Sequence, residues 1–177
     1  MSDPSSVATL YFITQSELRA LLGEVDRGPM FATVADEADR SHYEKIERDR
    51  ISEISLCCSP PVESAKAFLF PSKERVAIYP GAASEPEIGL SGDGRQIIIG
   101  LRACDLLAIE ILDQIMQEGD FEDPFYAQRR NHTLLLSTDC VTPAKTCFCN
   151  LVGGKPWPDG AYDLNLTCIK DGYVVAI

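Results

Sequence analysis

The sequence predicts an α/β fold, a mixed sheet with flanking helices and a C-terminal β-hairpin. Two short runs, Gln96 to Gly100 (QIIIG) and His132 to Ser137 (HTLLLS), are almost continuously apolar, which is typical of strands buried on both faces of a parallel sheet. Between them, Leu106 to Gln117 has an apolar surface with one narrow polar stripe and predicts a largely buried helix. Near the C-terminus, the dipeptide Asp171-Gly172 predicts a two-residue hairpin turn between alternating apolar segments.

The N-terminal part of the chain adds two strands and a helix. Ala8 to Ile13 is a short apolar run that predicts the first strand. Thr14 has the residue type of an N-cap for a helix over Gln15 to Leu22, which we expect Gly23 to end. Met30 to Val34 predicts the second strand.

The middle of the chain has more turn signals than regular patterns. We expect Asp36 to Arg50, which is dense in charge, to form irregular or short structure at the surface. The pair Pro60-Pro61 blocks a helix and interrupts any ladder of strand hydrogen bonds. Lys66 to Val76, with Phe68, Leu69 and Phe70 in a row before Pro71, predicts a buried extended segment that ends in a turn, and Gly81 to Gly94 predicts an exposed loop.

Composition and charge limit the class of protein. At 177 residues with 45% hydrophobic content, the chain can bury one good core, and we expect residues 1–177 to form a single domain. The net charge of -11 argues against nucleic acid or an anionic membrane as partner, because both are bound through clustered Lys and Arg. Met1 to Ser6 is polar and acidic, and no apolar run approaches the about 20 residues of a membrane span. We therefore expect a cytoplasmic protein that meets other proteins.

The cysteine count indicates a reducing compartment. Seven cysteines, an odd number in a chain without an export signal, favour reduced thiols or metal ligands over a disulfide framework. The adjacent Cys57 and Cys58 are interpreted as packing or loop residues that serve only as reserve ligands. Cys168 alternates in phase with two leucines and is interpreted as a core residue. His42 and His132 are interpreted as solvated side chains rather than ligands.

Four of the cysteines form the candidate site. Cys104 follows the QIIIG strand and lies beside a helix N-terminus, where free N–H groups and the helix dipole stabilise a thiolate or an anionic cluster. Cys140 follows the HTLLLS strand, so parallel pairing of the two strands would bring both cysteines to one sheet edge, where α/β proteins usually hold their chemistry. Cys147 and Cys149 lie in the long loop Val141 to Trp157, and Cys-Phe-Cys in an extended backbone would direct both sulfurs to one side.

The four thiols predict a metal centre. Four cysteines on two segments are enough to hold a [4Fe-4S] cluster or a zinc ion. Their spacing, Cys-x6-Cys-x-Cys plus one distant Cys, matches neither the bacterial ferredoxin run nor a zinc-ribbon pair. Our lead interpretation is therefore a [4Fe-4S] cluster ligated by Cys104, Cys140, Cys147 and Cys149.

Several blocks of the sequence resemble one protein family. In chain order between Lys66 and Val175 they are KAFLFPSKE, GLRACDLLAIEILDQI, GDFEDPFYAQRR, the run from Cys140 to Gly153 with its CFC, and YDLNLT. As a set they resemble the N-terminal domain of the cytosolic iron-sulfur (beta) subunits of soluble [NiFe] hydrogenases or sulfhydrogenases. The same domain begins the corresponding iron-sulfur subunit of anaerobic sulfite reductase, and the family is that of the 4Fe-4S dicluster domain-containing proteins.

The resemblance implies an electron-transfer component or domain of a cytosolic anaerobic oxidoreductase complex. Such a component relays electrons between a flavin or NAD(P) subunit and a catalytic subunit, so the implied partners are other subunits, flavin-containing or ferredoxin-like. Family members continue into a ferredoxin-like domain whose two cysteine runs bind two [4Fe-4S] clusters, and this sequence has no such runs. The chain stops at Ile177, inside an apolar strand. We therefore expect Ile177 to be the boundary of an expressed segment or the end of a fragment of a longer protein.

Two function classes follow. In the first, the four cysteines ligate one [4Fe-4S] cluster, and the domain relays single electrons without being catalytic itself. In the second, the domain is a docking or scaffold module with a structural zinc or no metal, and it recruits a partner through its acidic surface. A thiol enzyme with Cys104 as nucleophile lacks support, because neither histidine lies near Cys104 in the pattern.

Overall fold

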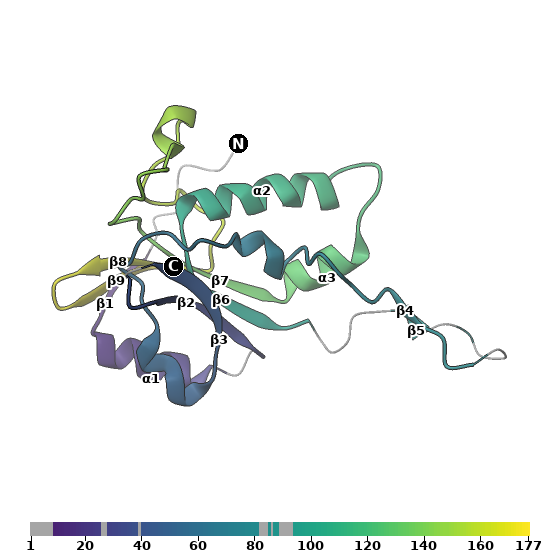
Figure 1. Ribbon diagram of the computed structural model, residues 1–177, viewed down its shortest axis with the longest axis horizontal. Coiled ribbons are helices and arrows are strands. Elements are labelled where there is room, and N and C mark those ends of the chain that lie inside the picture. The colour runs from purple at the N-terminus through teal and green to yellow at the C-terminus, as the bar shows by residue number, and fades with distance from the viewer. Residues whose placement is uncertain (1–8, 26–27, 39, 82–84, 86, 89–93) are drawn as a thin grey trace.

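The fold is a seven-stranded mixed sheet with helices on both faces (Figure 1). The computed structural model describes residues 9–25, 28–38, 40–81, 85, 87–88 and 94–177. The sheet order is β1-β9-β8-β7-β6-β2-β3, and its strands are β1 (Leu10–Ile13), β2 (Met30–Ala35), β3 (Ser41–Ile46), β6 (Gln96–Leu101), β7 (Thr133–Thr138), β8 (Leu164–Ile169) and β9 (Gly172–Ala176). The four central strands β8, β7, β6 and β2 pair in parallel, and the outer pairs are antiparallel. The predicted α/β class with a C-terminal hairpin is confirmed.

Helices cover the two faces of this sheet. The three α-helices are α1 (Gln15–Glu24), α2 (Ala103–Gln117) and α3 (Pro124–Asn131), and three short 3-10 helices are η1 (Arg48–Glu53), η2 (Ala65–Phe68) and η3 (Cys149–Val152). Figure 1 shows α1 and η1 on one face and α2 and α3 on the other. A short pair, β4 (Ala77–Ile78) and β5 (Glu87–Ile88), extends away from the sheet. Within the described residues, no helix is long and apolar enough to cross a membrane.

Strand β6 divides the core into two layers. Ile97 and Ile99 pack with Leu18 and Leu22 of α1 on one face. Ile98 packs with Leu106 and Ile109 of α2, and with Tyr126 of α3, on the other face. Because side chains alternate between the faces of a strand, a continuously apolar run serves both layers. The prediction that the QIIIG run is a central strand is confirmed, as every residue of β6 is buried.

The N-terminal helix is capped as predicted but ends later. The Thr14 Oγ1 accepts a hydrogen bond from the Glu17 N–H, and the Glu17 carboxylate accepts one from the Thr14 N–H, which makes a capping box. Gly23 does not end the helix, which continues to Glu24. The Val25 N–H closes the last turn by donating to the Leu21 carbonyl. Ala8 of the predicted first strand lies outside the described residues.

Two interpretations of the middle segment were wrong in detail. The charged stretch contains the edge strand β3, which pairs with β2 along its length. Its Ile46 enters the core, and its Tyr43 packs edge-on against Phe68 at 5.3 Å between ring centroids. Charge at an edge strand is common because it discourages pairing with other chains. The Phe68 segment is helical at η2 rather than extended, with Leu69 buried but Phe70 exposed. Most of the predicted loop from Gly81 to Gly94 lies outside the described residues.

A disulfide joins Cys57 to Cys168 across 111 residues of sequence. This differs from the expectation of reduced thiols throughout, although Cys168 packs against the core cluster as predicted. The pairing was invisible in the sequence because neither cysteine has a spacing signal. The five remaining cysteines are free thiols, namely Cys58, Cys104, Cys140, Cys147 and Cys149.

Reduction of the disulfide is expected to lower the free energy of unfolding by about 2–4 kcal/mol, because the open chain regains loop entropy. The measurement is urea unfolding of the metal-free protein with and without a thiol reductant. A variant with both Cys57→Ser and Cys168→Ser keeps the same five thiols and should not respond to the reductant. An unchanged wild-type midpoint would contradict the prediction.

Candidate functional site

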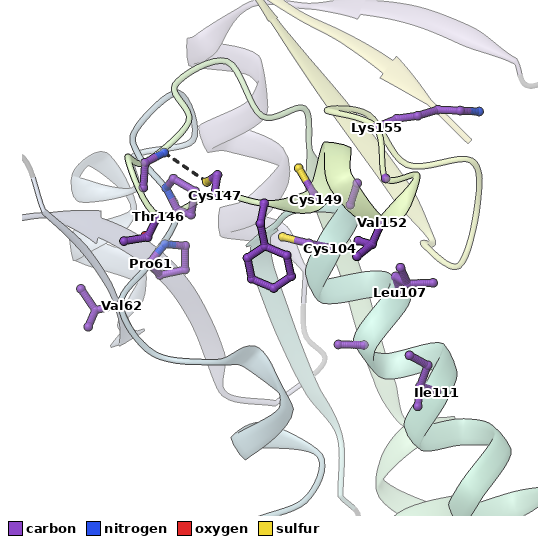
Figure 2. Close-up of a pocket in the computed structure, with 16 residues that line it drawn as sticks. Pro61, Val62, Cys104, Leu107, Ile111, Thr146, Cys147, Cys149, Val152 and Lys155 are labelled. Carbon is purple, nitrogen blue, oxygen red and sulfur yellow. Dashed lines mark hydrogen bonds between the residues drawn. The ribbon is translucent and has the colours of Figure 1, made fainter.

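A pocket of about 600 Å³ lies beside the N-terminal half of α2 (Figure 2). Its walls come from α2, from Pro60 to Val62, and from the loop between Ala144 and Lys155. The lining is mostly apolar, and the volume is in the range of small-molecule and cofactor sites. Figure 1 shows the loop with η3 rising beside the start of α2. The pocket therefore joins three segments that are far apart in the sequence.

Parallel pairing of β6 and β7 brings two of the predicted ligands, Cys104 and Cys140, to the edge of the sheet where both strands end. Strands β6 and β7 are parallel, with Gln96 opposite Thr133, and their register shifts after Ile99. Helix α2 begins immediately after β6, so Cys104 lies in its first turn rather than in a turn before it. Cys140 follows β7, and its N–H donates a hydrogen bond to the Pro156 carbonyl at 2.7 Å.

The two loop cysteines are arranged differently from the prediction. The backbone turns at Phe148, and Cys149 begins η3, so the Cys-Phe-Cys segment is not extended. The Cys147 Sγ accepts a hydrogen bond from the Ala144 N–H at 3.2 Å. The Cys149 carbonyl accepts one from the Gly154 N–H at 2.8 Å. In this turn-rich loop the backbone hydrogen bonds, rather than strand alternation, determine where the sulfurs lie.

Each of the four thiols interacts electrostatically with at least one of the others. Cys104, Cys147 and Cys149 line the pocket, and Figure 2 shows Cys104 projecting from α2 while Cys147 and Cys149 lie on the loop. The Cys140 and Cys149 thiols both raise the pKa of Cys104, and the Cys147 and Cys149 thiols raise that of Cys140. Cys58 is buried and donates to the Ser55 carbonyl instead. The structure therefore brings the candidate ligands into one neighbourhood, although Cys140 does not line the pocket itself.

The donor set meets part of what a metal centre needs. Among the described residues, no three His, Cys, Asp or Glu side chains form a ready-made metal-binding group. The chemistry of the neighbourhood nevertheless suits a thiophilic metal or an iron-sulfur cluster, because it supplies four thiols. Ligation of a metal by these four residues stays a prediction.

Desolvation by neighbouring atoms favours the protonated form of two of the thiols, although the Cys104 side chain is exposed at the surface and that of Cys140 is half-buried. It raises the pKa of Cys104 to about 11, with a further increase from the neighbouring Asp105 carboxylate. It also raises the pKa of Cys140, against the opposing effect of the Arg102 charge. The predicted stabilisation of a Cys104 thiolate by the helix N-terminus is thus outweighed by desolvation. A metal that binds these sulfurs would displace protons, so its affinity would rise with pH.

Alkylation of Cys104 is expected to accelerate with pH well beyond the range of an ordinary thiol. Only the thiolate reacts, so its rate in the metal-free protein should rise about tenfold per pH unit from pH 8 to pH 10. A peptide thiol, with a pKa of about 8.5, should level off in this interval. Rates of iodoacetamide labelling, followed by peptide mass spectrometry, provide the measurement. Asp105→Asn removes a carboxylate that raises the pKa and should speed the reaction; a plateau near pH 9 in the wild type would contradict the prediction.

Sequence reasoning missed Arg102, which lies under the thiol neighbourhood. Its side chain is 1% exposed, and it donates hydrogen bonds to the carbonyls of Leu56, Cys58 and Asp139. An arginine placed directly between a buried strand and a candidate ligand was a usable signal. It connects the chain after β6 to the chain after β7 and to the segment that precedes Pro60.

The two histidines lie outside the pocket. The His42 Nε2 contacts the Glu44 carboxylate at 2.8 Å on β3, and His132 is an exposed residue at the end of α3. Among the described residues that line the pocket, none is a histidine. The described pocket lining therefore offers no histidine partner for Cys104.

Comparison with known proteins gives a distant relative. The chain is similar to the sulfhydrogenase 2 subunit beta of Pyrococcus furiosus, with 29% identity over 138 residues. This similarity supports a relationship to hydrogenase beta subunits. The match covers 77% of this chain and 39% of the relative, so the chain spans less than half of that protein's length. No family model matches the chain. No solved structure matches it.

Proposed function

We propose that this protein is an iron-sulfur component of a hydrogenase-like oxidoreductase complex. In this proposal Cys104, Cys140, Cys147 and Cys149 hold one [4Fe-4S] cluster, and the domain relays electrons between a flavin or NAD(P) subunit and a catalytic subunit. The observation that carries the proposal is the neighbourhood of four free thiols at one edge of the sheet. The similarity to a sulfhydrogenase beta subunit supports the choice of an electron-transfer complex.

The residues around the thiols suit this role. A bound cluster of this kind supplies one-electron transfer, and hydrogen bonds to its sulfurs and its exposure to solvent adjust the potential. The Ala144 N–H already donates to the Cys147 sulfur. The positive end of the α2 helix dipole lies in the first turn of the helix and favours negative charge beside Cys104. The pocket wall beside the thiols is largely apolar and includes Leu107 and Phe148.

The face around the pocket has the character of a docking surface. The side chains of Phe148 and Leu151 are 65% and 87% exposed. Along α2, exposed apolar residues recur one turn apart at Leu107, Ile111 and Ile115. Contiguous exposed apolar surface marks an interaction site more often than a free surface. A neighbouring protein of the proposed complex would cover this face and place its own redox group near the thiols.

The same surface also supports the alternative function. A docking or scaffold module would use this face without electron transfer, and the four thiols would then bind a structural zinc or no metal. Zinc and iron-sulfur centres use the same thiolate ligands, so the residues alone do not separate the two functions. The metal content of the purified protein separates them.

The test is an absorption spectrum with iron, acid-labile sulfide and zinc analysis of protein purified without oxygen. The proposal expects a brown sample with about four irons and four sulfides per chain. A colourless sample with about one zinc per chain would overturn the electron relay and support the docking module. A folded, colourless and metal-free sample would overturn both metal centres.

A further inference from the structure

Arg102 is a buried cation with an incomplete set of partners. Its terminal nitrogens donate to the carbonyls of Leu56 at 2.9 Å, Cys58 at 2.8 Å and Asp139 at 3.2 Å. Its Nε is buried and has no hydrogen-bond partner among the residues that the structure describes. A buried donor without a partner costs about 1–3 kcal/mol, more for a charged group. The surrounding carbonyls therefore accept hydrogen bonds from the terminal nitrogens of this guanidinium but not from its Nε.

The charge of Arg102 is also not neutralised by an ion pair. Within the part of the chain that the structure describes, the guanidinium makes no salt bridge. The Asp105 carboxylate is close enough to be affected by the Arg102 charge, but it accepts a hydrogen bond from the Arg102 backbone N–H instead. The Asp139 carboxylate binds Asn165 and Thr167. Burying a cation against neutral carbonyls is unfavourable unless an anion lies nearby.

The thiol neighbourhood can supply that anion. Arg102 precedes Cys104 by two residues, and it binds the carbonyl of Asp139, which is bonded to Cys140. Desolvation raises the pKa of the Cys140 thiol, and the positive charge of Arg102 opposes this rise. When four thiolates surround a divalent metal or a four-iron cluster, the centre carries a net negative charge. A fixed cation that is shielded from water stabilises such a centre more than an exposed lysine does.

We infer that Arg102 is the counter-charge of an anionic metal–thiolate centre formed by Cys104, Cys140, Cys147 and Cys149. The inference deepens the proposed function and rests on it for the identity of the cluster, but it applies to any thiophilic metal held by these residues. Arg102 acts as a positioning and electrostatic residue and does not itself ligate the metal. Its three carbonyl contacts hold the charge in place and also connect the two strand ends that carry Cys104 and Cys140.

The test separates the effect of the Arg102 charge from the effect of its hydrogen bonds to the three carbonyls. Arg102→Lys keeps the positive charge but loses the forked geometry that spans three carbonyls. Arg102→Gln removes the charge and keeps a donor. Lys155→Gln is the control, because Lys155 lines the same pocket but is exposed and paired with Asp159. Each variant is prepared without oxygen in the reduced, metal-free form, and circular dichroism verifies its fold.

Two readouts are then recorded. The first is the Kd for Co²⁺, followed by the charge-transfer absorption of cobalt–thiolate bonds. The second is the midpoint potential after reconstitution with iron and sulfide. Arg102→Gln removes an opposite charge close to a thiolate. This variant should therefore bind Co²⁺ about a hundredfold more weakly than the wild type. The same variant should make reduction about tenfold harder, which is about 59 mV for one electron. Arg102→Lys and Lys155→Gln should stay near the wild type in both readouts.

The outcomes are distinguishable from failure of the proposed function. Equal losses in folded Arg102→Lys and Arg102→Gln would reduce Arg102 to a structural bridge and overturn the inference, as would a wild-type Kd in Arg102→Gln. If Arg102→Gln does not fold, loss of tight Co²⁺ binding in folded Arg102→Lys is by itself enough to overturn it. If the wild-type protein binds Co²⁺ but assembles no iron and sulfide, the proposed [4Fe-4S] cluster is overturned. The Co²⁺ affinities of the variants then decide whether Arg102 is the counter-charge. A folded wild type that binds neither overturns both.

Discussion

Cys147→Ser is expected to remove most of the iron and sulfide from the protein without unfolding it. A serine hydroxyl is a hard ligand that stays protonated at neutral pH, so it replaces a thiolate poorly in a soft-metal centre. The fold should survive because Cys147 is exposed in a loop, where its N–H donates only to the Ala144 carbonyl. The measurement is iron and sulfide content, together with visible absorption and far-ultraviolet circular dichroism.

The four ligand candidates form a series with an internal control. Serine variants of Cys104, Cys140 and Cys149 should each lose the iron in the same way. Cys58→Ser is the matched control, because Cys58 is also a free thiol near Arg102 but donates to the Ser55 carbonyl, which a serine can do equally well. A full complement of iron in any one of the four variants would exclude that residue as a ligand. Loss of iron in Cys58→Ser alone would instead identify the buried cysteine as the missing ligand.

Gly100→Ala is expected to destabilise the fold by about 3–5 kcal/mol. Gly100 has a φ of +92°, a region that L side chains rarely adopt, and it lies where the β6–β7 register shifts. A Cβ at this position would approach the Thr33 Oγ1 to 2.3 Å, and Thr33 is fully buried on the neighbouring strand β2. Strain and overpacking therefore add, immediately before the residues that lead to Arg102 and Cys104. Urea unfolding measures the loss.

Two other glycines separate the causes of this loss. Gly153 has a φ of +78° but open space at its Cβ position, so Gly153→Ala should cost about 1–2 kcal/mol from backbone strain alone. Gly160 has open space and no positive φ, so Gly160→Ala should change stability by no more than about 0.5 kcal/mol. If the clash with Thr33 matters, Gly100→Ala should cost less in a Thr33→Ala background. Equal losses for Gly100→Ala and Gly153→Ala would contradict the overpacking explanation.

Local patterns predicted the elements that carry strong signals. The apolar runs before Gly100 and Ser137 identified the central strands β6 and β7, since burial on both faces leaves few polar positions in the sequence. The α1 cap at Thr14 depends on contacts three residues apart and could be read directly. The β3 edge strand escaped notice because its stability comes from pairing with β2, which no residue within the segment reveals.

The features of the candidate site also divide into those that local patterns predicted and those that they did not. Parallel pairing of two recognisable strands was enough to predict that Cys104 and Cys140 lie at one sheet edge. The turn at Phe148 was not predicted, because the local hydrogen bonds of its loop, such as the one from the Leu151 N–H to the Phe148 carbonyl, leave no apolar period in the sequence. The Cys57–Cys168 disulfide and the contacts of Arg102 were hidden because they join segments that are far apart in the sequence.

The sequence alone was enough for the fold class and the two central strands, and it supplied the four cysteines that we predict to be metal ligands. These features follow from the period of apolar residues and from residue types, which are properties of short segments. The tertiary structure was needed to show which thiols line the pocket, which cysteines form the disulfide, and that the buried Arg102 guanidinium binds the carbonyls of Leu56, Cys58 and Asp139. Those features depend on contacts between segments up to 111 residues apart, and such contacts are fixed by packing and electrostatics in three dimensions rather than by local pattern.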